Sequence, residues 1–509
     1  MTNRVPELSP RDEHNLELLA NVHPPDWVNP QPAPRYNLVV LGAGTAGLVS
    51  AAGAAGLGAK VALVERHLMG GDCLNVGCVP SKTLIRAARA VADVRRAAQF
   101  GIHLHGEMRV DFGAVMERVR RVRAHISPHD GARRFKEHYG VDIFLGEGRF
   151  IGPDTVEVAG ARLTFERAVV ATGARPAAPP IPGLGEAGFY TNETIFNLTE
   201  LPPRLAVVGG GPIGCELAQA FARLGSRVTI IEMASQFLPR EDPEAAAILR
   251  AELEKDGVDV RLGTTLERVE TKGRAKVLHL KAGDECATVE ADALLVGVGR
   301  APNVEGLGLE TAGIDFDRTG VKVDRFFRTS NRRVYAAGDV CSAFKFTHAA
   351  DFMARAVIQN AFFGLVGKKP ANTLTIPWCT YTDPEIAHVG LYEHEAAAKG
   401  IAVTTFTVPL TEVDRAVTDG DEEGFVKIVA KAGSDTILGC TIVARHAGEM
   451  ISEVTTAMAG KLGLGALAAV IHPYPTQAEA IRKAGDFYNR TRLTAGRKKL
   501  LSRYFAWRR

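Results

Sequence analysis

The chain has 509 residues, more than one hydrophobic core normally holds, and this length predicts roughly three or four domains. Hydrophobic residues make up 46% and charged residues 23%, as in ordinary soluble globular proteins, so a collagen, a disordered chain and a disulfide scaffold are excluded. The net charge of +3 is too small over this length to indicate a nucleic-acid-binding protein.

The cysteines and the N-terminus bear on where the protein works. The 7 cysteines are an odd number and thinly spread, which is typical of a reducing compartment, where a close pair is redox-active or metal-binding. The N-terminus has no apolar signal core, and no run of about 18 apolar residues occurs. These features predict a cytoplasmic protein.

The first part of the chain is rich in proline. We expect residues 1–35 to form an extended arm rather than a folded module or a metal site. From Tyr36 onward, short apolar runs alternate with Ala-rich helical stretches. This alternation predicts the α/β class with a parallel sheet.

The sequence contains an internal repeat. Residues 38–65 align without gaps with residues 205–232, at a constant offset of 167, and 11 of the 28 aligned residues are identical. The simplest explanation is two copies of one nucleotide-binding unit.

The first copy contains Gly42-x-Gly44-x-x-Gly47 between an apolar strand and a helix of small residues. Gly42 allows a tight turn, Gly44 lets the backbone approach a pyrophosphate, and Gly47 lets helix and strand pack closely. Glu65 ends the next strand, about 20 residues on, where a carboxylate accepts hydrogen bonds from a ribose diol. The pattern predicts a dinucleotide site.

The second copy has its glycines at Gly209, Gly211 and Gly214 and ends at Glu232. A carboxylate at Glu232 repels a 2′-phosphate and binds a free ribose diol. No arginine follows directly to hold such a phosphate, so NADH is predicted over NADPH.

Cys73 and Cys78 lie in GGDCLNVGCVPSK, directly after the first nucleotide unit. The C-x4-C spacing is compatible with a disulfide where the chain bends into a helix, with two inert thiols, or with half of a zinc site. No second close pair of ligands supports zinc, and we predict no metal site. The flanking glycines and the adjacent nucleotide unit favour a redox disulfide. We interpret Asp72, beside Cys73, as a cap of the following helix.

Three further motifs follow in order: ATGARP at 171–176, GVGRAPN at 297–303 and VYAAGDV at 334–340. Together with the cysteine segment they resemble the flavin-dependent pyridine nucleotide–disulfide oxidoreductases over about residues 36–485. The resemblance implies two Rossmann-like domains and a C-terminal α+β dimerisation domain. The expected boundaries are 36–190 and 301–372 for FAD, 191–300 for NAD(H), 373–485 for dimerisation and 486–509 for a basic tail.

The resemblance also implies roles for individual residues. Electrons would pass from NADH through FAD to a Cys73–Cys78 disulfide and on to an acceptor, with Cys78 next to the flavin and Cys73 facing substrate. Lys82, paired with Glu216, would stabilise negative charge on the reduced ring. The residues expected to bind FAD are Gly42, Gly44, Gly47, Glu65, Lys82, Thr172, Gly173 and Asp339, and those expected to bind NADH are Gly209, Gly211, Gly214 and Glu232.

The segment HPYPTQAEA departs from the thiol-reducing members of the family, which have a histidine directly before Pro-Thr. Tyr474 occupies that position, His472 lies two residues earlier, and Glu479 aligns with the family's glutamate. A phenol with a pKa of about 10 is a poor base at neutral pH. The tyrosine resembles mercuric reductases, although the vicinal C-terminal cysteines typical of those enzymes are absent here. We therefore favour a metal ion or metal–thiol complex as acceptor, with lipoamide or another small disulfide, or a quinone, as alternatives.

The resemblance further implies a homodimer in which His472, Tyr474 and Glu479 complete the neighbouring subunit's site. A non-enzyme alternative is a redox-responsive flavin-binding partner protein. The joint retention of four residues argues against it: Cys73, Cys78, Lys82 and Glu216. The last 20 residues carry 8 Lys or Arg among aromatic residues. This tail has two interpretations: weak contact with an anionic membrane surface, or a solvated helix packed on the body, which we prefer.

Overall fold

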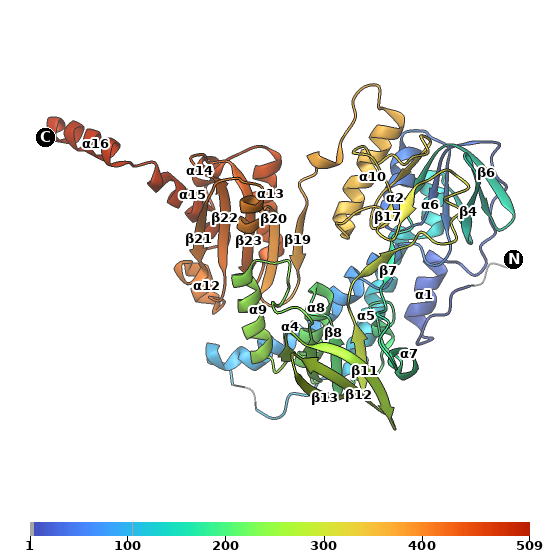
Figure 1. The fold of residues 1–509 in the computed structure, drawn as a ribbon, viewed down its shortest axis with the longest axis horizontal. Helices are drawn as coiled ribbons and strands as arrows, with labels where there is room; N and C mark the ends of the chain where they lie inside the picture. Colours follow the sequence, from blue (N-terminus) through green and yellow to red (C-terminus); the bar gives the residue numbers. More distant parts are fainter. Residues whose placement is uncertain (1–4, 104) are drawn as a thin grey trace. The chain divides into compact units, whose positions relative to one another are not determined.

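The computed structural model describes residues 5–103 and 105–509, which form two compact units (Figure 1). The first unit comprises Met1–Met233 and Gly263–Leu374, and the second comprises Ala234–Leu262 and Thr375–Arg509. Among the described residues, every helix is too short or too polar to span a bilayer.

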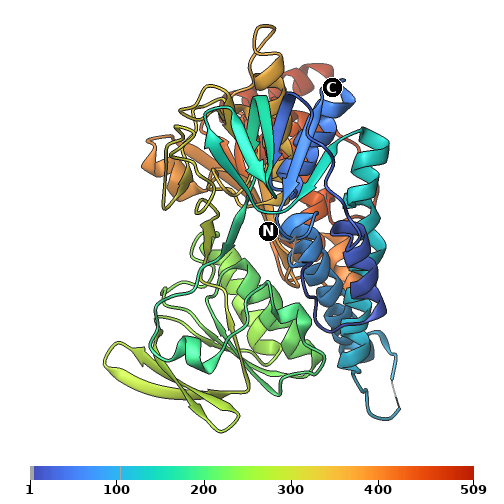
Figure 2. The same cartoon turned by 90° about the vertical axis from the view of Figure 1, so that its right-hand side faces the viewer.

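The first unit is built on a seven-stranded sheet, drawn mostly in blue and cyan in Figure 2. A parallel half has the order β3-β2-β1-β6 with β18 also paired to β6, and β6 continues into an antiparallel half with β5 and β4. The apolar strands β1 and β2 are buried on both faces, as expected for parallel strands covered by helices. The strands are β1 (Tyr36–Leu41), β2 (Val61–Glu65), β3 (Asp142–Leu145), β4 (Gly148–Gly152), β5 (Thr155–Val158), β6 (Ala161–Val170) and β18 (Val334–Ala336).

The second copy of the repeat forms its own parallel sheet within the first unit. Strand β8 (Arg204–Val208) lies between β9 (Arg227–Ile231) and β14 (Ala293–Val296), and α8 (Pro212–Leu224) connects β8 to β9. An antiparallel sheet covers it, made of β11 (Thr265–Lys272), β12 (Ala275–Ala282) and β13 (Glu285–Ala291). The α/β class with two nucleotide-binding sheets is confirmed.

Two of the sequence motifs form short strands that pair with each other in a separate two-stranded sheet. Strand β7 (Ala174–Pro176) comes from ATGARP and β15 (Arg300–Pro302) from GVGRAPN, and they are antiparallel. The other elements of the first unit are α2 (Thr45–Gly56), α3 (Gly71–Asn75), α4 (Cys78–Arg96), η1 (Ala97–Phe100), α5 (Phe112–Ile126), η2 (Ser127–Asp130), α6 (Ala132–Tyr139), α7 (Leu184–Ala187), η3 (Ile195–Asn197), β16 (Phe316–Asp317), β17 (Gly320–Val321), α10 (Thr347–Phe362) and η4 (Ala371–Thr373).

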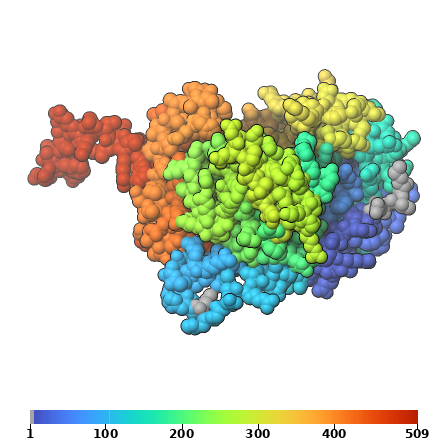
Figure 3. Space-filling model, turned by 60° about the horizontal axis from the view of Figure 1, so that its bottom comes forward, coloured from blue at the N-terminus to red at the C-terminus, as the bar shows by residue number. Residues whose placement is uncertain are grey.

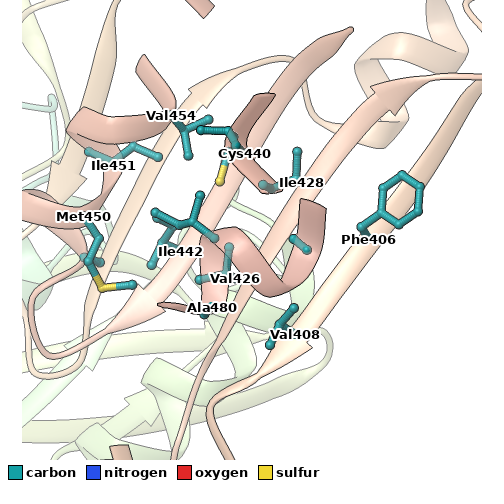
Figure 4. Packing of buried hydrophobic residues seen from close by; sticks show 14 of the residues in the cluster. Phe406, Val408, Val426, Ile428, Cys440, Ile442, Met450, Ile451, Val454 and Ala480 are labelled. Atoms are coloured by element: carbon teal, nitrogen blue, oxygen red, sulfur yellow. The ribbon is translucent and has the colours of Figure 1, made fainter. Parts of the chain in front are cut away.

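The second unit is a five-stranded antiparallel sheet with helices packed on it. The strand order is β19-β20-β23-β22-β21, and its buried side chains form one core with those of α13 and α15 (Figure 4). The elements are α9 (Pro243–Lys255), β10 (Asp259–Arg261), β19 (Pro377–Thr380), β20 (Glu385–Gly390), α11 (Glu393–Ala398), β21 (Val403–Pro409), η5 (Leu410–Glu412), α12 (Asp414–Asp419), β22 (Phe425–Lys431), β23 (Ile437–Ala444), α13 (Ala447–Ala459), α14 (Leu464–Ala469), α15 (Glu479–Thr491) and α16 (Ala495–Arg508).

The N-terminal arm is not extended throughout, so that prediction was wrong for part of it. Residues Glu13–Val22 form helix α1, capped by the Asp12 side chain, which accepts a hydrogen bond from Asn15 N at 2.9 Å. Leu18 and Val22 are fully buried. The prolines flank this helix rather than interrupt it, and its one-turn spacing of apolar residues supplies a face that packs on α5.

The C-terminal tail also differs from the preferred interpretation. Helix α16 does form, but each of its residues is exposed, and Figure 3 shows it as a projection from the rest of the second unit. It is therefore not packed on the body of that unit.

Candidate functional site

The first glycine loop has the geometry of a phosphate cradle. Gly42 has a φ of +99°, which favours glycine, and a Cβ on Gly47 would lie 1.8 Å from the Gly42 carbonyl oxygen. Helix α2 begins directly afterwards at Thr45, and no described side chain caps its first turn. Its N–H groups and partial positive charge are therefore available to a pyrophosphate.

The second loop repeats this arrangement. Gly209 has a φ of +105°, a Cβ on Gly214 would lie 2.1 Å from the Gly209 oxygen, and α8 starts with Gly211 as an N-cap that provides no side chain. Proline at the first position of α8 is compatible with the helix because its missing N–H would have no intrahelical partner. The two copies of the repeat thus share their local fold.

Both terminal glutamates hold their loops through backbone hydrogen bonds. Glu65 Oε2 accepts from Ala43 N at 2.7 Å, and Glu232 Oε2 accepts from Gly210 N at 2.6 Å. Glu65 also accepts from His67 N at 2.8 Å, while burial raises the pKa of its carboxyl group. Each carboxylate thus lies at the loop, where a ribose would bind.

The three later motifs meet beside the first loop. Thr172 Oγ1 donates to Asn303 O at 2.7 Å, and Asn303 Nδ2 donates back to Thr172 O at 2.9 Å. Gly173, the next residue, has a φ of +67°. Asp339 follows β18, which pairs with β6, and burial raises the pKa of its carboxyl group. These contacts bring Thr172, Gly173 and Asp339 to the carboxyl end of the parallel strands, where α/β sheets bind ligands.

Asp72 does not cap a helix, so that interpretation was wrong. Its carboxylate forms an ion pair with Arg300, whose Nε also lies 3.6 Å from Asp339 Oδ2. The first turn of α3 starts from Gly70, and α4 starts from Gly77, neither of which has a side chain that could cap. The ion pair with Arg300 takes the place of the hydrogen bonds that Asp72 would accept from backbone N–H groups as a helix cap.

These features fit FAD. The open N-terminus of α2 would hold its pyrophosphate, Glu65 its adenosine ribose, and Asp339 its ribityl side. The first glycine loop supports this fit: a side chain on Gly47 would collide with the backbone of Gly42, so the loop packs as closely as a pyrophosphate-binding loop requires.

Cys73 and Cys78 are both free thiols and lie on either side of the kink between α3 and α4. Their side chains form a hydrogen bond, and the Cys78 sulfur also lies 3.5 Å from Thr347 Oγ1. The hydrogen bond from Cys73 is the largest cause that lowers the pKa of Cys78, to about 6, with smaller contributions from Thr347 and Lys82. The same hydrogen bond and burial raise the pKa of Cys73.

The two sulfurs are therefore chemically unequal. Cys78 is solvent-accessible, begins the long helix α4 and carries the thiolate at neutral pH, whereas Cys73 is half-buried and keeps its proton. A thiolate hydrogen-bonded to a neighbouring thiol is the reduced form of a pair that can close to a disulfide.

Lys82 and Glu216 form an ion pair close to this site. Lys82 Nζ lies 2.7 Å from Glu216 Oε2, and the glutamate side chain is almost fully buried. Lys82 lies one helical turn after Cys78 on α4, and α4 packs on α8, which carries Glu216. The packing of these two helices thus places a cation near Cys78.

The three C-terminal candidates lie in the second unit, and each has a different partner. The exposed Tyr474 donates from its hydroxyl to Asp414 Oδ2 at 2.7 Å, which raises the pKa of the phenol. His472 Nε2 lies 2.9 Å from Glu453 Oε1. Glu479 Oε1 accepts from Arg482 at 2.7 Å. Within the described chain, these hydrogen bonds and ion pairs therefore do not join the three residues into one relay.

Sequence reasoning missed Thr347, Arg300, Asp414 and Glu453. Arg300 lies within the GVGRAPN motif, but no motif marks the other three, and the partner of each of the four lies outside its own local segment. Across the part of the chain that the structure describes, no group of three or more His, Cys, Asp or Glu side chains is placed to hold a metal ion.

Comparison with known proteins places the site in a family. The model of the pyridine nucleotide-disulphide oxidoreductases matches residues 36–354, and the model of their dimerisation domain matches 376–485. A mercuric reductase of Bacillus cereus is 36% identical over 450 residues, which cover 88% of this chain and 71% of that protein. A dihydrolipoyl dehydrogenase of Thermus scotoductus is 37% identical over 457 residues, which cover 89% and 97%.

Solved structures agree with these matches. The Cu(II) complex of the HOCl-induced flavoprotein disulfide reductase from Escherichia coli has a TM-score of 0.79 at 30% identity, covering 89% of this chain and 100% of that one. The structure of LpdA from Mycobacterium tuberculosis has a TM-score of 0.80 at 29% identity, covering 90% and 99%. The chain belongs to the pyridine nucleotide-disulphide oxidoreductase family.

Proposed function

We propose that this oxidoreductase transfers electrons from NADH, through FAD and the Cys73–Cys78 pair, to a soft metal ion or its thiol complex. Its family binds FAD and a nicotinamide nucleotide, and its dimerisation domain supports a homodimer. The observation that carries the proposal is the unequal thiol pair, in which Cys78 has a pKa of about 6. Such a pair is reactive at neutral pH and persists in the reducing cytoplasm, where we place the enzyme.

FAD, when bound, supplies the two-electron carrier between the nicotinamide and the sulfurs. The chain's residues supply binding and charge: the α2 N-terminus and Glu65 hold the ADP half, and Lys82 stabilises negative charge near the ring. The Glu216 carboxylate orients Lys82 through their 2.7 Å ion pair.

The acceptor assignment rests on Tyr474. Its hydroxyl already donates to Asp414, and the raised pKa keeps the phenol protonated, so it cannot take a proton from a thiol at neutral pH. Soft metal ions bind thiolates and need little proton transfer. The solved Cu(II) complex of the E. coli relative and the similarity to mercuric reductases support this choice.

Two organic acceptors remain as alternatives. Similarity to dihydrolipoyl dehydrogenases of equal identity supports lipoamide or another small disulfide, and a quinone is a further candidate. A flavoprotein that only senses redox state would have no need of the Lys82–Glu216 pair beside Cys78. Bleaching of the flavin by NADH in the isolated protein would distinguish an enzyme from such a binding protein.

We propose NADH as the electron donor. Glu232 lies at the second loop through its bond to Gly210, where its charge repels a 2′-phosphate. The next residues, Met233, Ala234 and Ser235, offer no arginine to hold such a phosphate.

We also propose that the dimer completes the active site, with His472, Tyr474 and Glu479 facing the partner's Cys73. These residues lie in the matched dimerisation domain, and Tyr474 is 70% exposed in the single chain, as a residue that meets another subunit would be. A fully active monomer in light scattering would contradict a shared site.

A second proposed function is a weak contact of the C-terminal tail with a membrane surface. We propose that α16 rests on anionic membrane surfaces, because residues 490–509 carry 8 cations and no acidic residue. The exposed Phe505 and Trp507 would enter the headgroup region.

The decisive experiment measures NADH oxidation by the purified holoenzyme with Hg(II)–thiol, Cu(II), lipoamide and glutathione disulfide. We expect turnover with the metal acceptors and its loss in Cys73→Ser and Cys78→Ser. Activity with lipoamide alone would refute the metal assignment, and full turnover by Cys73→Ser would refute the role of the pair.

A further inference from the structure

A buried arginine links the N-terminal helix to the turn between the two cysteines. Arg123 on α5 donates from Nη1 to Asn75 O at 2.7 Å and from Nη2 to Asn15 Oδ1 at 2.6 Å. The residue is 3% exposed, and although burial lowers its pKa to about 10, the guanidinium stays charged at neutral pH. Asn75 is the last residue of α3, where a carbonyl has no intrahelical partner. A charged donor from α5 satisfies it.

Asn15 is itself held in place by the chain around it. Its backbone N donates to Asp12 at the helix cap, and its Nδ2 donates to Pro10 O at 2.7 Å. Asp12 also forms an ion pair with Arg120, one turn before Arg123 on α5. The side-chain oxygen of Asn15 is thus aimed at Arg123 by two bonds of its own.

The other end of α1 is attached to the same loop. Val22 O accepts from Met69 N at 3.1 Å, and His23 Nδ1 donates to His67 O. His23 is fully buried. The loop closes on itself through Asn75 Nδ2, which donates to Met69 O at 3.0 Å. Three separate bonds therefore run from the N-terminal segment, directly or through Arg123, to residues 67–75.

We propose that residues 10–23, here called the strap, position the redox loop of residues 66–78, and that Arg123 is the positioning residue between them. This inference rests on the proposed function, since it concerns the geometry of the proposed redox pair. The strap lies outside the matched family model, which begins at residue 36. The contacts that hold the redox loop are therefore made in part by N-terminal residues that the family model does not include.

Loss of these contacts is expected to change the hydrogen bond between the two thiols. The hydrogen bond from Cys73 to Cys78 spans the turn between α3 and α4, and Asn75 is the last residue of α3 before that turn. If Arg123 loses its fixed position, the kink gains freedom and the sulfur–sulfur hydrogen bond weakens. The Cys78 pKa should then move up toward the ordinary thiol value.

The test compares two asparagines on the same helix. Asn15→Leu removes the acceptor of Arg123, whereas Asn21→Leu removes only a bond to Ser127 Oγ, on a segment without redox residues. The reduced holoenzyme is alkylated with iodoacetamide across a pH series, and labelling of Cys78 is followed by mass spectrometry. We expect Asn15→Leu to raise the Cys78 pKa by about one unit, a roughly ten-fold loss of thiolate at low pH. Asn21→Leu should match the wild type.

Arg123→Lys provides a second variant if Asn15→Leu does not fold. Lysine keeps the charge but lacks the planar fork that reaches two acceptors, so an intermediate rise is expected. One outcome is that the variant folds and keeps an unchanged Cys78 pKa while the wild type shows the low-pKa thiol and NADH-driven reduction of the pair. That result would refute the positioning role of the strap but would not contradict the proposed function. A wild-type protein without a low-pKa thiol or NADH-driven reduction of the pair would instead refute the proposed function.

Discussion

The unequal acidity of the two thiols leads to a quantitative prediction for Cys73→Ala. The Cys78 pKa is about 6, against an ordinary value of 9.0, and the largest cause of the difference is the hydrogen bond from Cys73. At pH 7, a pKa of about 6 leaves roughly 90% of Cys78 as thiolate, and a pKa of about 8 leaves roughly 10%. Removing the Cys73 donor should therefore slow alkylation of Cys78 at pH 7 by up to about ten-fold.

The assay is the pH dependence of iodoacetamide labelling of Cys78 in the reduced holoenzyme. Because the thiolate is the reactive form, labelling of the wild type should fall as pH drops through about 6, and that of Cys73→Ala should fall at a higher pH. Cys73→Ser, which keeps a hydroxyl donor, is the matched control and should retain most of the lowering.

A Cys73→Ala protein whose labelling midpoint stays near pH 6 would refute this reasoning. The thiolate would then depend on Lys82 and the N-terminus of α4 instead. The order of effects separates the causes further, since Cys73→Ala should raise the Cys78 pKa more than Thr347→Val, and Thr347→Val more than Lys82→Met.

Three other changes test separate parts of the proposal. Glu232→Gln removes the charge that repels a 2′-phosphate, so the ratio of kcat/KM for NADPH to that for NADH should rise about ten-fold in steady-state assays; an unaltered ratio would place discrimination elsewhere. Tyr474→His restores an imidazole base, so turnover with lipoamide should rise by about 10²-fold, and no gain would argue that the missing base does not limit disulfide reduction. Deletion of residues 490–509 should abolish co-sedimentation with phosphatidylserine vesicles; equal binding by both forms would remove the membrane role.

Much of the fold and site was encoded locally. The glycine loops are specified by backbone needs that only glycine meets, as at Gly42 with its positive φ, and by the direct contact of Gly47 with Gly42. The repeat predicted two nucleotide-binding units with the same local fold, because the same short glycine pattern forms the same turn and helix start in both copies. The glycines around Cys73 and Cys78 and the adjacent nucleotide unit favoured a redox pair over inert thiols, and the family resemblance implied the pairing of Lys82 with Glu216, which the structure shows.

Contacts between distant residues were decided only by the tertiary structure. Thr347 lies 269 residues from Cys78, so nothing in the cysteine motif indicates its hydroxyl. Asp72 contacts Arg300 across 228 residues instead of capping a helix, because a nearby cation attracts its carboxylate more strongly than free N–H groups do. The proline-rich arm contains a docked helix because α5 offers an apolar face and two buried arginines, which composition alone does not reveal.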